Sequence, residues 1–202
     1  MQGDGKIIIV GGFTTFNGVE RNSIARLNTD GTLDETFNLG TGANAVIFDV
    51  ALQSDGKIII VGNFTSYNGY TKKNIARINI DGSIDSTFNS YSSGTATVTC
   101  VSIQNDGKII IGGGFSSYNA NTVTGLIRLN SDGSHDTTFN WNVVFGVPET
   151  ISIQSDGKII VGGSFVISQN VNARIMRLNL DGSSDQTFSA GLGPNNVVYT
   201  SF

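Results

Sequence analysis

The sequence repeats one pattern four times. In each copy an Asp-Gly pair precedes a Lys and a short apolar run, and a Phe lies seven residues after the Lys. An Arg-aliphatic-Asn unit, a second Asp-Gly pair and an Asp-x-Thr-Phe segment follow. The first Asp occupies positions 4, 55, 106 and 156, so successive copies lie 51, 51 and 50 residues apart. Self-similarity at this period indicates a repeat architecture, and side chains present in every copy are expected to be structural.

The third copy shows the strands that one repeat predicts. Thr97–Ile103 alternates β-branched and small residues, and an Asp-Gly turn joins it to the β-branched run Lys108–Gly112, which is too short for a helix. Gly113 and Gly114 then predict a bulge or a close strand contact. Gly125–Asn130 predicts a third strand after a polar loop. His135–Phe139 predicts a short edge strand or turn.

Strands of this number and length favour a β-propeller. No window keeps the apolar spacing of a helix over three turns, and about fifty residues is the size of one blade. The rungs of a β-solenoid, the rival architecture, are usually shorter. We therefore predict one all-β domain over residues 1–202, a four-bladed propeller with repeats at about 2–52, 53–103, 104–153 and 154–202. The segment 195–202 aligns with first strands, so we expect it to complete the first blade; the alternatives are a larger ring formed by several chains, or a slice of a longer array.

A family resemblance follows from the segment that joins two repeats. It reads Arg-Leu-Asn-x-Asp-Gly-x-x-Asp-x-Thr-Phe-Asn at Arg26–Asn38 and recurs at 77–89 and 128–140, and with Ser189 in place of the last Asn in the fourth copy. This pattern resembles the delta-proteobacterial sixty-residue β-propeller repeat (delta-60 repeat) of bacterial surface, secreted and phage-associated proteins. The resemblance implies a propeller in an extracellular, cell-surface or virion setting and carries no catalytic residue over.

Composition excludes several classes of partner. Twelve acidic and eight basic residues stand at repeat positions, and together they supply the whole net charge of −4. No basic stripe is present, which argues against nucleic acid and against an anionic membrane surface as partners. No apolar stretch approaches the length of a membrane span, and no signal peptide is visible in this chain.

Catalysis is not predicted. The single His135 stands where the other copies have Leu33, Ile84 and Ser184, so we interpret it as a half-exposed turn residue. The single Cys100 lies in an apolar stretch and excludes an internal disulfide. Almost every Asp has equivalents in the other copies, which leaves Asp49 and Glu149 as the outliers for a carboxylate pair. A propeller-type glycan lyase or hydrolase is therefore only a distant alternative.

Calcium is the sharpest metal hypothesis. The Asn-x-Asp-Gly-x-x-Asp segment places oxygen ligands at alternate positions before a Gly turn, in partial likeness to calcium loops. The competing interpretation is an Asx-stabilised turn whose last Asp pairs with the repeated Arg. No other cofactor is expected. The candidate ligands are Asn28, Asp30, Asp34, Asn79, Asp81, Asp85, Asn130, Asp132, Asp136, Asn179, Asp181 and Asp185.

Binding is expected on the divergent loops, because recognition residues commonly lie on loops over a rigid scaffold. Aromatic side chains among Asn, Ser and Thr suit contact with a sugar or a peptide, so we predict a non-enzymatic module that binds a glycan or a protein. The alternatives are a structural component of a phage tail or other assembly, with self-association, and a designed or excised propeller fragment. Three of the candidates align with one another and are alternatively blade-packing residues. The candidates are Tyr70, Tyr91 and Trp141, and the aligned Phe16, Tyr67 and Tyr118.

Overall fold

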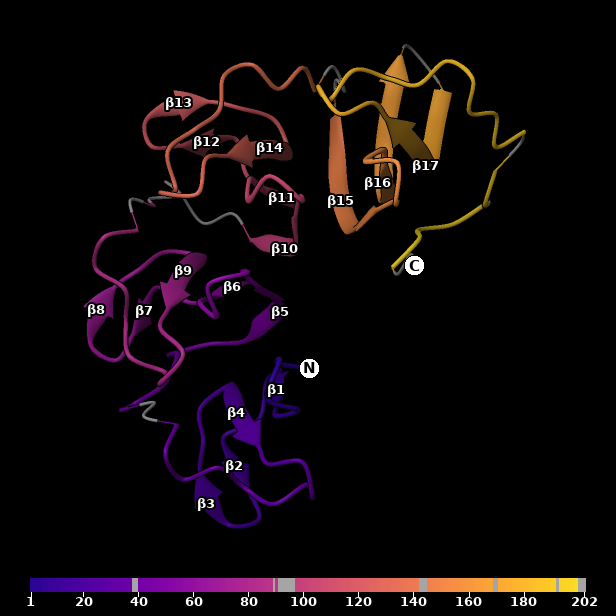
Figure 1. Cartoon of the computed structure of the whole chain (residues 1–202). Coiled ribbons are helices and arrows are strands. Elements are labelled where there is room, and N and C mark those ends of the chain that lie inside the picture. Colours follow the sequence, from indigo (N-terminus) through magenta and orange to yellow (C-terminus); the bar gives the residue numbers. More distant parts are fainter. Residues whose placement is uncertain are drawn as a thin grey trace. The chain divides into compact units, whose positions relative to one another are not determined.

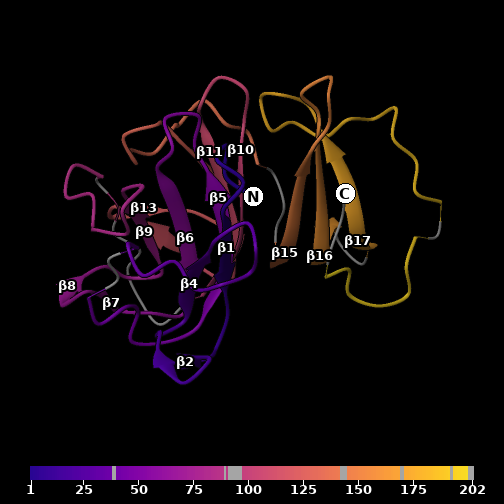
Figure 2. The ribbon, with the colours of Figure 1, turned by 60° about the horizontal axis from the view of Figure 1, so that its bottom comes forward.

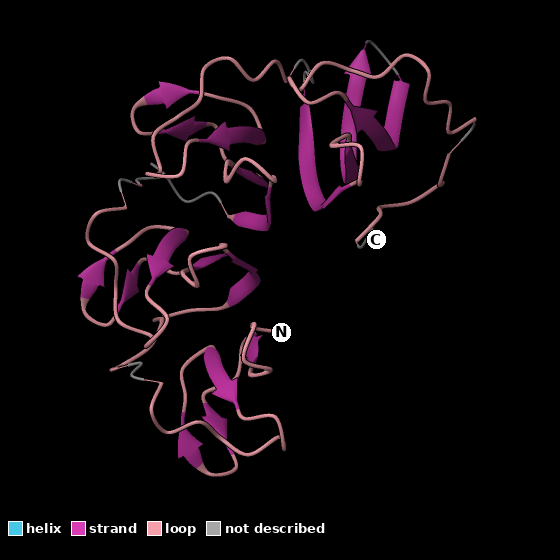
Figure 3. Ribbon diagram, viewed as in Figure 1, coloured by secondary structure: helices cyan, strands magenta, loops and turns pink. Residues whose placement is uncertain are grey.

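The computed structural model describes residues 1–37, 40–88, 90, 97–141, 145–168, 171–191 and 193–199 (Figure 1). Over these residues the chain is all-β and has no helix, as the secondary-structure colouring shows (Figure 3). The chain divides into two compact units, Met1–Tyr91 and Ser92–Phe202, each of which holds two repeats. Tyr91 and part of the expected C-terminal strand (200–202) lie outside the described residues.

The strands recur in the order that the repeats predict. The first repeat holds β1 (Ile7–Val10), β2 (Thr15–Phe16), β3 (Val19–Glu20) and β4 (Ile24–Leu27). The second holds β5 (Ile47–Leu52), β6 (Ile58–Gly62), β7 (Ser66–Tyr67), β8 (Tyr70–Thr71) and β9 (Ile75–Ile78). The third holds β10 (Val98–Ile103), β11 (Ile109–Gly113), β12 (Ser117–Tyr118), β13 (Asn121–Thr122) and β14 (Leu126–Leu129). The fourth holds β15 (Phe145–Ile153), β16 (Ile159–Ser168) and β17 (Val171–Leu178).

Three of the repeats form a three-stranded antiparallel sheet, with the orders β5-β6-β9, β10-β11-β14 and β15-β16-β17. Figure 2 shows β15, β16 and β17 side by side. At His135–Phe139, where a short edge strand or a turn was predicted, the structure has a single bridge between Leu129 and His135 followed by a turn. The polar loop of the third repeat, in contrast, contains the small hairpin β12-β13, which the sequence pattern did not predict.

The first repeat differs, because its sheet contains only β1 and β4. Ile7 on β1 is 38% exposed, whereas its counterparts Ile58, Ile109 and Ile159 are fully buried beneath their first strands. The described C-terminal residues 193–199 contain no strand. Closure of the ring through this segment is therefore not confirmed.

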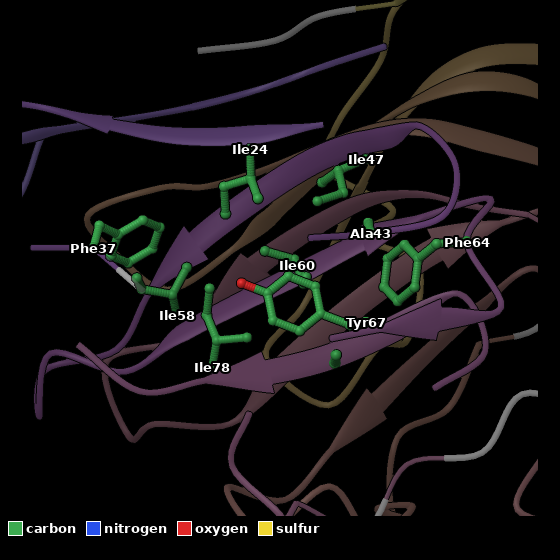
Figure 4. Close-up of a cluster of buried hydrophobic side chains, with 10 residues drawn as sticks. Ile24, Phe37, Ala43, Ile47, Ile58, Ile60, Phe64, Tyr67 and Ile78 are labelled. Carbon is green, nitrogen blue, oxygen red and sulfur yellow. The ribbon is translucent and has the colours of Figure 1, made fainter. Parts of the chain in front are cut away.

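Each unit has its own apolar core. In the first unit, β-branched residues of β4, β6 and β9 pack with Phe64 and the fully buried Tyr67 (Figure 4). In the second unit, Ile159, Val161 and Phe165 of β16 pack with Leu126 and Leu178. Every residue of β6 is buried, which explains why this strand is a continuous apolar run rather than an alternating one.

Glycine is required at the end of the second strand of a repeat, where it pairs with the first strand of the same sheet. The first strand has a bulge at this point, between Ile47 and Asp49 in the second repeat. A methyl group on Gly62 would lie 2.2 Å from the backbone oxygen of Val46, and one on Gly113 2.3 Å from that of Thr97. The predicted close contact at the glycine pair is confirmed, although the bulge itself lies on the neighbouring strand.

We expect Gly62→Ala to destabilise the protein by about 2 kcal/mol or more, since backbone atoms cannot move aside to admit the methyl group. Gly3→Ala is the control, because no atom lies within 4 Å of its added methyl group. Urea denaturation followed by circular dichroism measures both midpoints. An unchanged midpoint for Gly62→Ala would contradict the close approach of the two strands.

Candidate functional site

The calcium candidates of each repeat include one aspartate whose carboxylate already forms ion pairs with a lysine and an arginine. Asp34 Oδ2 accepts hydrogen bonds from Arg26 Nε at 2.6 Å and from Lys6 Nζ at 2.7 Å. Its other oxygen, Oδ1, accepts from the backbone N–H and the hydroxyl of Thr36 at 3.0 and 2.6 Å. The same set recurs in all four repeats. We call these residues the core aspartates: Asp34, Asp85, Asp136 and Asp185.

The charge of the core aspartate is stabilised against its own burial. Burial alone would raise the pKa of Asp34, but the hydrogen bonds from Lys6, Thr36 and Arg26 outweigh it and hold the pKa well below its ordinary value. The same balance lowers the pKa of Asp85 and Asp136. The carboxylate is therefore ionised at neutral pH, with both oxygens occupied by protein donors.

The arginine also joins neighbouring repeats inside each unit. The Arg26 guanidinium lies over the ring of Phe37, 4.5 Å from its centroid, and its Nη1 donates to the backbone oxygen of Ile80 in the next repeat. In the second unit Arg128 Nη1 donates to Leu180 O at 2.6 Å. One guanidinium thus connects the aspartate, the phenylalanine and the following repeat.

The remaining calcium candidates stabilise a turn. Asp30 Oδ1 accepts from the backbone N–H and hydroxyl of Thr32 at 2.9 and 2.6 Å, and Asn28 Nδ2 donates to Thr32 Oγ1 at 3.0 Å. These bonds are those of an Asx turn, and they lower the pKa of Asp30. The part of the chain that the structure describes contains no group of three or more His, Cys, Asp or Glu placed to hold a metal. The geometry supports the turn interpretation, and calcium binding stays a prediction.

The structure places the aromatic candidates in different environments. Tyr67 and Tyr118 are fully buried, and their hydroxyls donate to Gly82 O and Gly133 O at 3.0 and 2.7 Å, which is a packing arrangement. Burial raises the pKa of both hydroxyls. Phe16 is half-buried on β2, and Tyr70 is exposed on β8.

Trp141 lies beside a pocket of about 240 Å³ on the third repeat. Its ring meets that of Phe165 edge-to-face, with the centroids 6.0 Å apart and the planes at 78°. Thr122 and Thr124 line the pocket with exposed side chains, and Phe139 and the buried Leu126 supply apolar surface. We call this cavity the Trp141 pocket.

His135 also lines the Trp141 pocket, where sequence reasoning saw only a turn residue. Its Nδ1 atom is buried and has no hydrogen-bond partner among the described residues. A buried polar atom without a partner costs roughly 1–3 kcal/mol, so it favours a ligand or water that supplies the bond. The bridge to Leu129 positions His135 at the end of β14, and this pairing could not be read from the residue pattern.

The acidic outliers and the cysteine do not form a catalytic set. Asp49 belongs to the first unit and Glu149 to the second, so the structure does not bring them together within one unit. Partial burial raises the pKa of Glu149, which lies at the bulge of β15. Cys100 is buried on β10, and its thiol donates to Pro148 O at 3.7 Å.

Comparison with known proteins identifies the family. The family described as a "domain of unknown function (DUF5122) beta-propeller" matches residues 2–37, 53–88, 104–139 and 154–188. The chain belongs to this family of propeller repeats. No curated protein matches the chain. Among solved structures it is similar to a protein of unknown function from Bacteroides caccae, at 13% identity and a TM-score of 0.42, over 88% of this chain and 91% of that one. Within the described residues no helix is long and apolar enough to cross a membrane.

We expect the core aspartates to make the protein sensitive to acid. Because their pKa is lowered on folding, their contribution to stability is complete above the unfolded pKa of about 4 and is lost as the pH falls below it. Asp85→Asn should cost about 3–5 kcal/mol at neutral pH, since it leaves Lys57 and Arg77 without their counter-charge. Between about pH 4 and pH 2, the stability of Asp85→Asn should then fall less than that of the unmodified protein.

Urea midpoints measured across this pH range test the expectation. Asp55→Asn is the matched control, because it removes an exposed carboxylate of the same repeat and keeps the buried ion pairs. If Asp85→Asn lost stability in acid as steeply as the unmodified protein, the core aspartates would not be the acid-sensitive groups.

Proposed function

We propose that this protein is a carbohydrate-binding propeller module and that the Trp141 pocket holds the sugar. The observation that carries the proposal is that Trp141, Phe139 and His135 line one pocket, and that His135 Nδ1 is buried without a hydrogen-bond partner among the described residues. Trp141 and His135 have no counterparts of their type in the other three repeats, so neither residue is required by the repeat itself.

The size and lining of the pocket support a single sugar ring. Its volume of about 240 Å³ lies below the roughly 300–1,000 Å³ of sites for drug-sized ligands. A sugar offers an apolar face of C–H groups to the rings of Trp141 and Phe139. Its hydroxyls can donate to or accept from the imidazole of His135 and the threonine hydroxyls.

The scaffold for this site, we propose, is a four-bladed ring that the C-terminal segment closes. Val198 is spaced from Ile47, Val98 and Pro148 by the repeat period, and these three residues lie opposite Gly62, Gly113 and Gly163 in their sheets. Val198 also has the environment of a first strand. A methyl group on Gly162 would lie 2.8 Å from its Cγ1, just as one on Gly112 would lie 2.9 Å from the Cβ of Pro148.

The free edge of β1 is the partner that this register requires. Gly11 is the counterpart of Gly62, but the nearest atom to an added methyl group is a ring carbon of Phe13 at 3.5 Å, so space remains for a strand. Carrying the register of β5 and β6 over, we propose that Val198 pairs with Gly11 and that Ser201, which lies outside the described residues, pairs with Ile9. Pairing there would also remove an exposed strand edge.

The setting of the protein follows from the delta-60 resemblance alone. Repeats of that kind occur in surface, secreted and phage-associated proteins, so we infer an extracellular, cell-surface or virion location. A role as a structural part of an assembly is the competing function, and the binding experiment separates the two.

Sugar binding is measurable through the only tryptophan in the chain. We expect saturable fluorescence changes with at least one of the methyl glycosides of glucose, galactose, mannose and N-acetylglucosamine, because Trp141 is the sole reporter and lines the site. His135→Ser, which installs the residue that the fourth repeat carries, should weaken the affinity about tenfold through the lost hydrogen bond.

Tyr70→Ala is the matched control, since it removes an exposed aromatic side chain from the other unit. On a glycan array this variant should retain binding, whereas Trp141→Ala should lose it. Absence of binding to every glycan, together with self-association on a sizing column, would favour the structural role.

Ring closure is testable by a disulfide in a Cys100→Ala background. Ile9→Cys with Ser201→Cys should oxidise to a cross-linked monomer that migrates faster on a non-reducing gel, since paired strands bring such residues within disulfide distance. The control pair, Val10→Cys with Ser201→Cys, is out of register by one residue and should cross-link poorly. Disulfide-linked oligomers would show that several chains share the ring, and equal yields for both pairs would contradict the register.

A further inference from the structure

The described residues of both units form the same kind of cleft, between the Asp-Gly turns of consecutive repeats. In the first unit it has a volume of about 460 Å³ and in the second about 260 Å³. We call these cavities the Asp-Gly clefts. The first is lined by Gln2, Asp4, Leu52, Gln53, Asp55 and Ile80, and the second by the equivalent Gln104, Asp106, Ile153, Asp156 and Leu180.

Two carboxylates without counter-ions line each cleft. Asp4 Oδ1 and Asp55 Oδ1 accept the backbone N–H of Lys6 and Lys57, each at 3.0 Å. Neither aspartate forms an ion pair with any described residue, because the ammonium groups of these lysines bind the core aspartates instead. In the second unit Asp106 and Asp156 have the same arrangement. Each cleft therefore carries two carboxylates, and Met1, which bears the α-ammonium group of this chain, also lines the first cleft.

A buried amide adds an unsatisfied acceptor to the first cleft. Gln2 is only 8% exposed, and its Oε1 has no hydrogen-bond partner within the described part of the chain. The Oε1 of Gln53, on the adjacent turn, is also buried and unpartnered. In the second cleft Gln104 Oε1 has only a long contact of 3.4 Å with Arg128 Nη1. Such an acceptor favours a ligand that donates hydrogen bonds.

An exposed aliphatic side chain completes each cleft. Ile80 is 56% exposed and Leu180 58%, which is unusual for residues of this type in a polar turn. Hydrogen bonds from Arg26 and Arg128 to the backbone oxygens of Ile80 and Leu180 fix the positions of these two residues. The cleft thus combines an apolar surface with carboxylates and an amide oxygen.

We propose that each Asp-Gly cleft binds a primary alkylammonium group, supplied by the lysine side chain of a basic partner protein. The ammonium has three donors and a positive charge for the two carboxylates and the glutamine, and its methylene stem packs on Ile80 or Leu180. A divalent metal ion fits less well, because it needs more oxygen ligands and makes no use of an aliphatic surface. This inference goes beyond the proposed sugar site and involves none of its residues.

Methyl NMR tests the inference at both clefts separately. With labelled isoleucine and leucine methyl groups, the peptide acetyl-Gly-Lys-Gly-amide should shift the signals of Ile80 and Leu180 in a saturable manner. The peptide in which norleucine replaces lysine should not shift them, because it keeps the stem and lacks the charge. Spermidine and calcium chloride are the competing probes.

Asp4→Asn and Asp55→Asn are the informative variants, because Asn Oδ1 can keep the turn hydrogen bond while the charge is removed. Each should weaken the response at Ile80 about fivefold, the effect of one partly screened charge, and leave that at Leu180 unchanged. Asp30→Asn is the matched control, since it removes a charge from a similar turn outside the cleft.

Three results would overturn the proposal. The first is an equal response to the lysine and norleucine peptides. The second is a response at Ile80 that Asp30→Asn weakens as much as Asp55→Asn does. The third is a much tighter response to spermidine or calcium than to the lysine peptide, which would assign the clefts to a polyamine or a metal instead of a lysine side chain. None of these results depends on whether the Trp141 pocket binds sugar.

Discussion

In each repeat one buried carboxylate forms hydrogen bonds and ion pairs with residues of several surrounding segments. Asp34 binds the lysine that precedes β1, the arginine of β4 and the threonine of its own turn, and the arginine also donates to the next repeat. A single charge removed from this set would leave the others buried without compensation, which costs more than an ordinary surface pair. The repeated Lys, Arg, Asp, Thr and Phe are therefore explained together, as one interaction present four times.

The periodic sequence predicted those parts of the fold that local chemistry determines. The apolar runs at Ile58–Gly62 and Ile109–Gly113 are strands because β-branched residues and bounding Asp-Gly turns leave few alternatives. The sequence did not predict the hairpin β12-β13, whose strands have only two residues each and no apolar periodicity. It left open a short edge strand or a turn at His135–Phe139, and the structure has a turn there with one bridge at His135.

The candidate site was only partly predictable. Trp141 was identified because no repeat position explains it, and this reasoning needs nothing but alignment of the copies. His135 was dismissed because its position is occupied by Leu33, Ile84 and Ser184, which describes the backbone of the turn and not the environment of the side chain. Its proposed role depends on Trp141 lining the same pocket, an arrangement that no local pattern encodes.

The proposed binding role of the Asp-Gly clefts depends on one position at which the four copies differ, although the Asp-Gly pair that follows it is the same in all of them. All four copies supply the acidic turns, but the residue before the second Asp-Gly pair alternates: Thr29, Ile80, Ser131 and Leu180. The aliphatic residues occur in the second and fourth copies, and these are the copies whose turns complete a cleft with the preceding repeat in the same unit. The proposed lysine site therefore takes its acidic turns from two consecutive repeats of one unit and its aliphatic residue from the second of them. In this proposal, alternation between copies supplies the recognition surface, and the residues common to all copies maintain the scaffold.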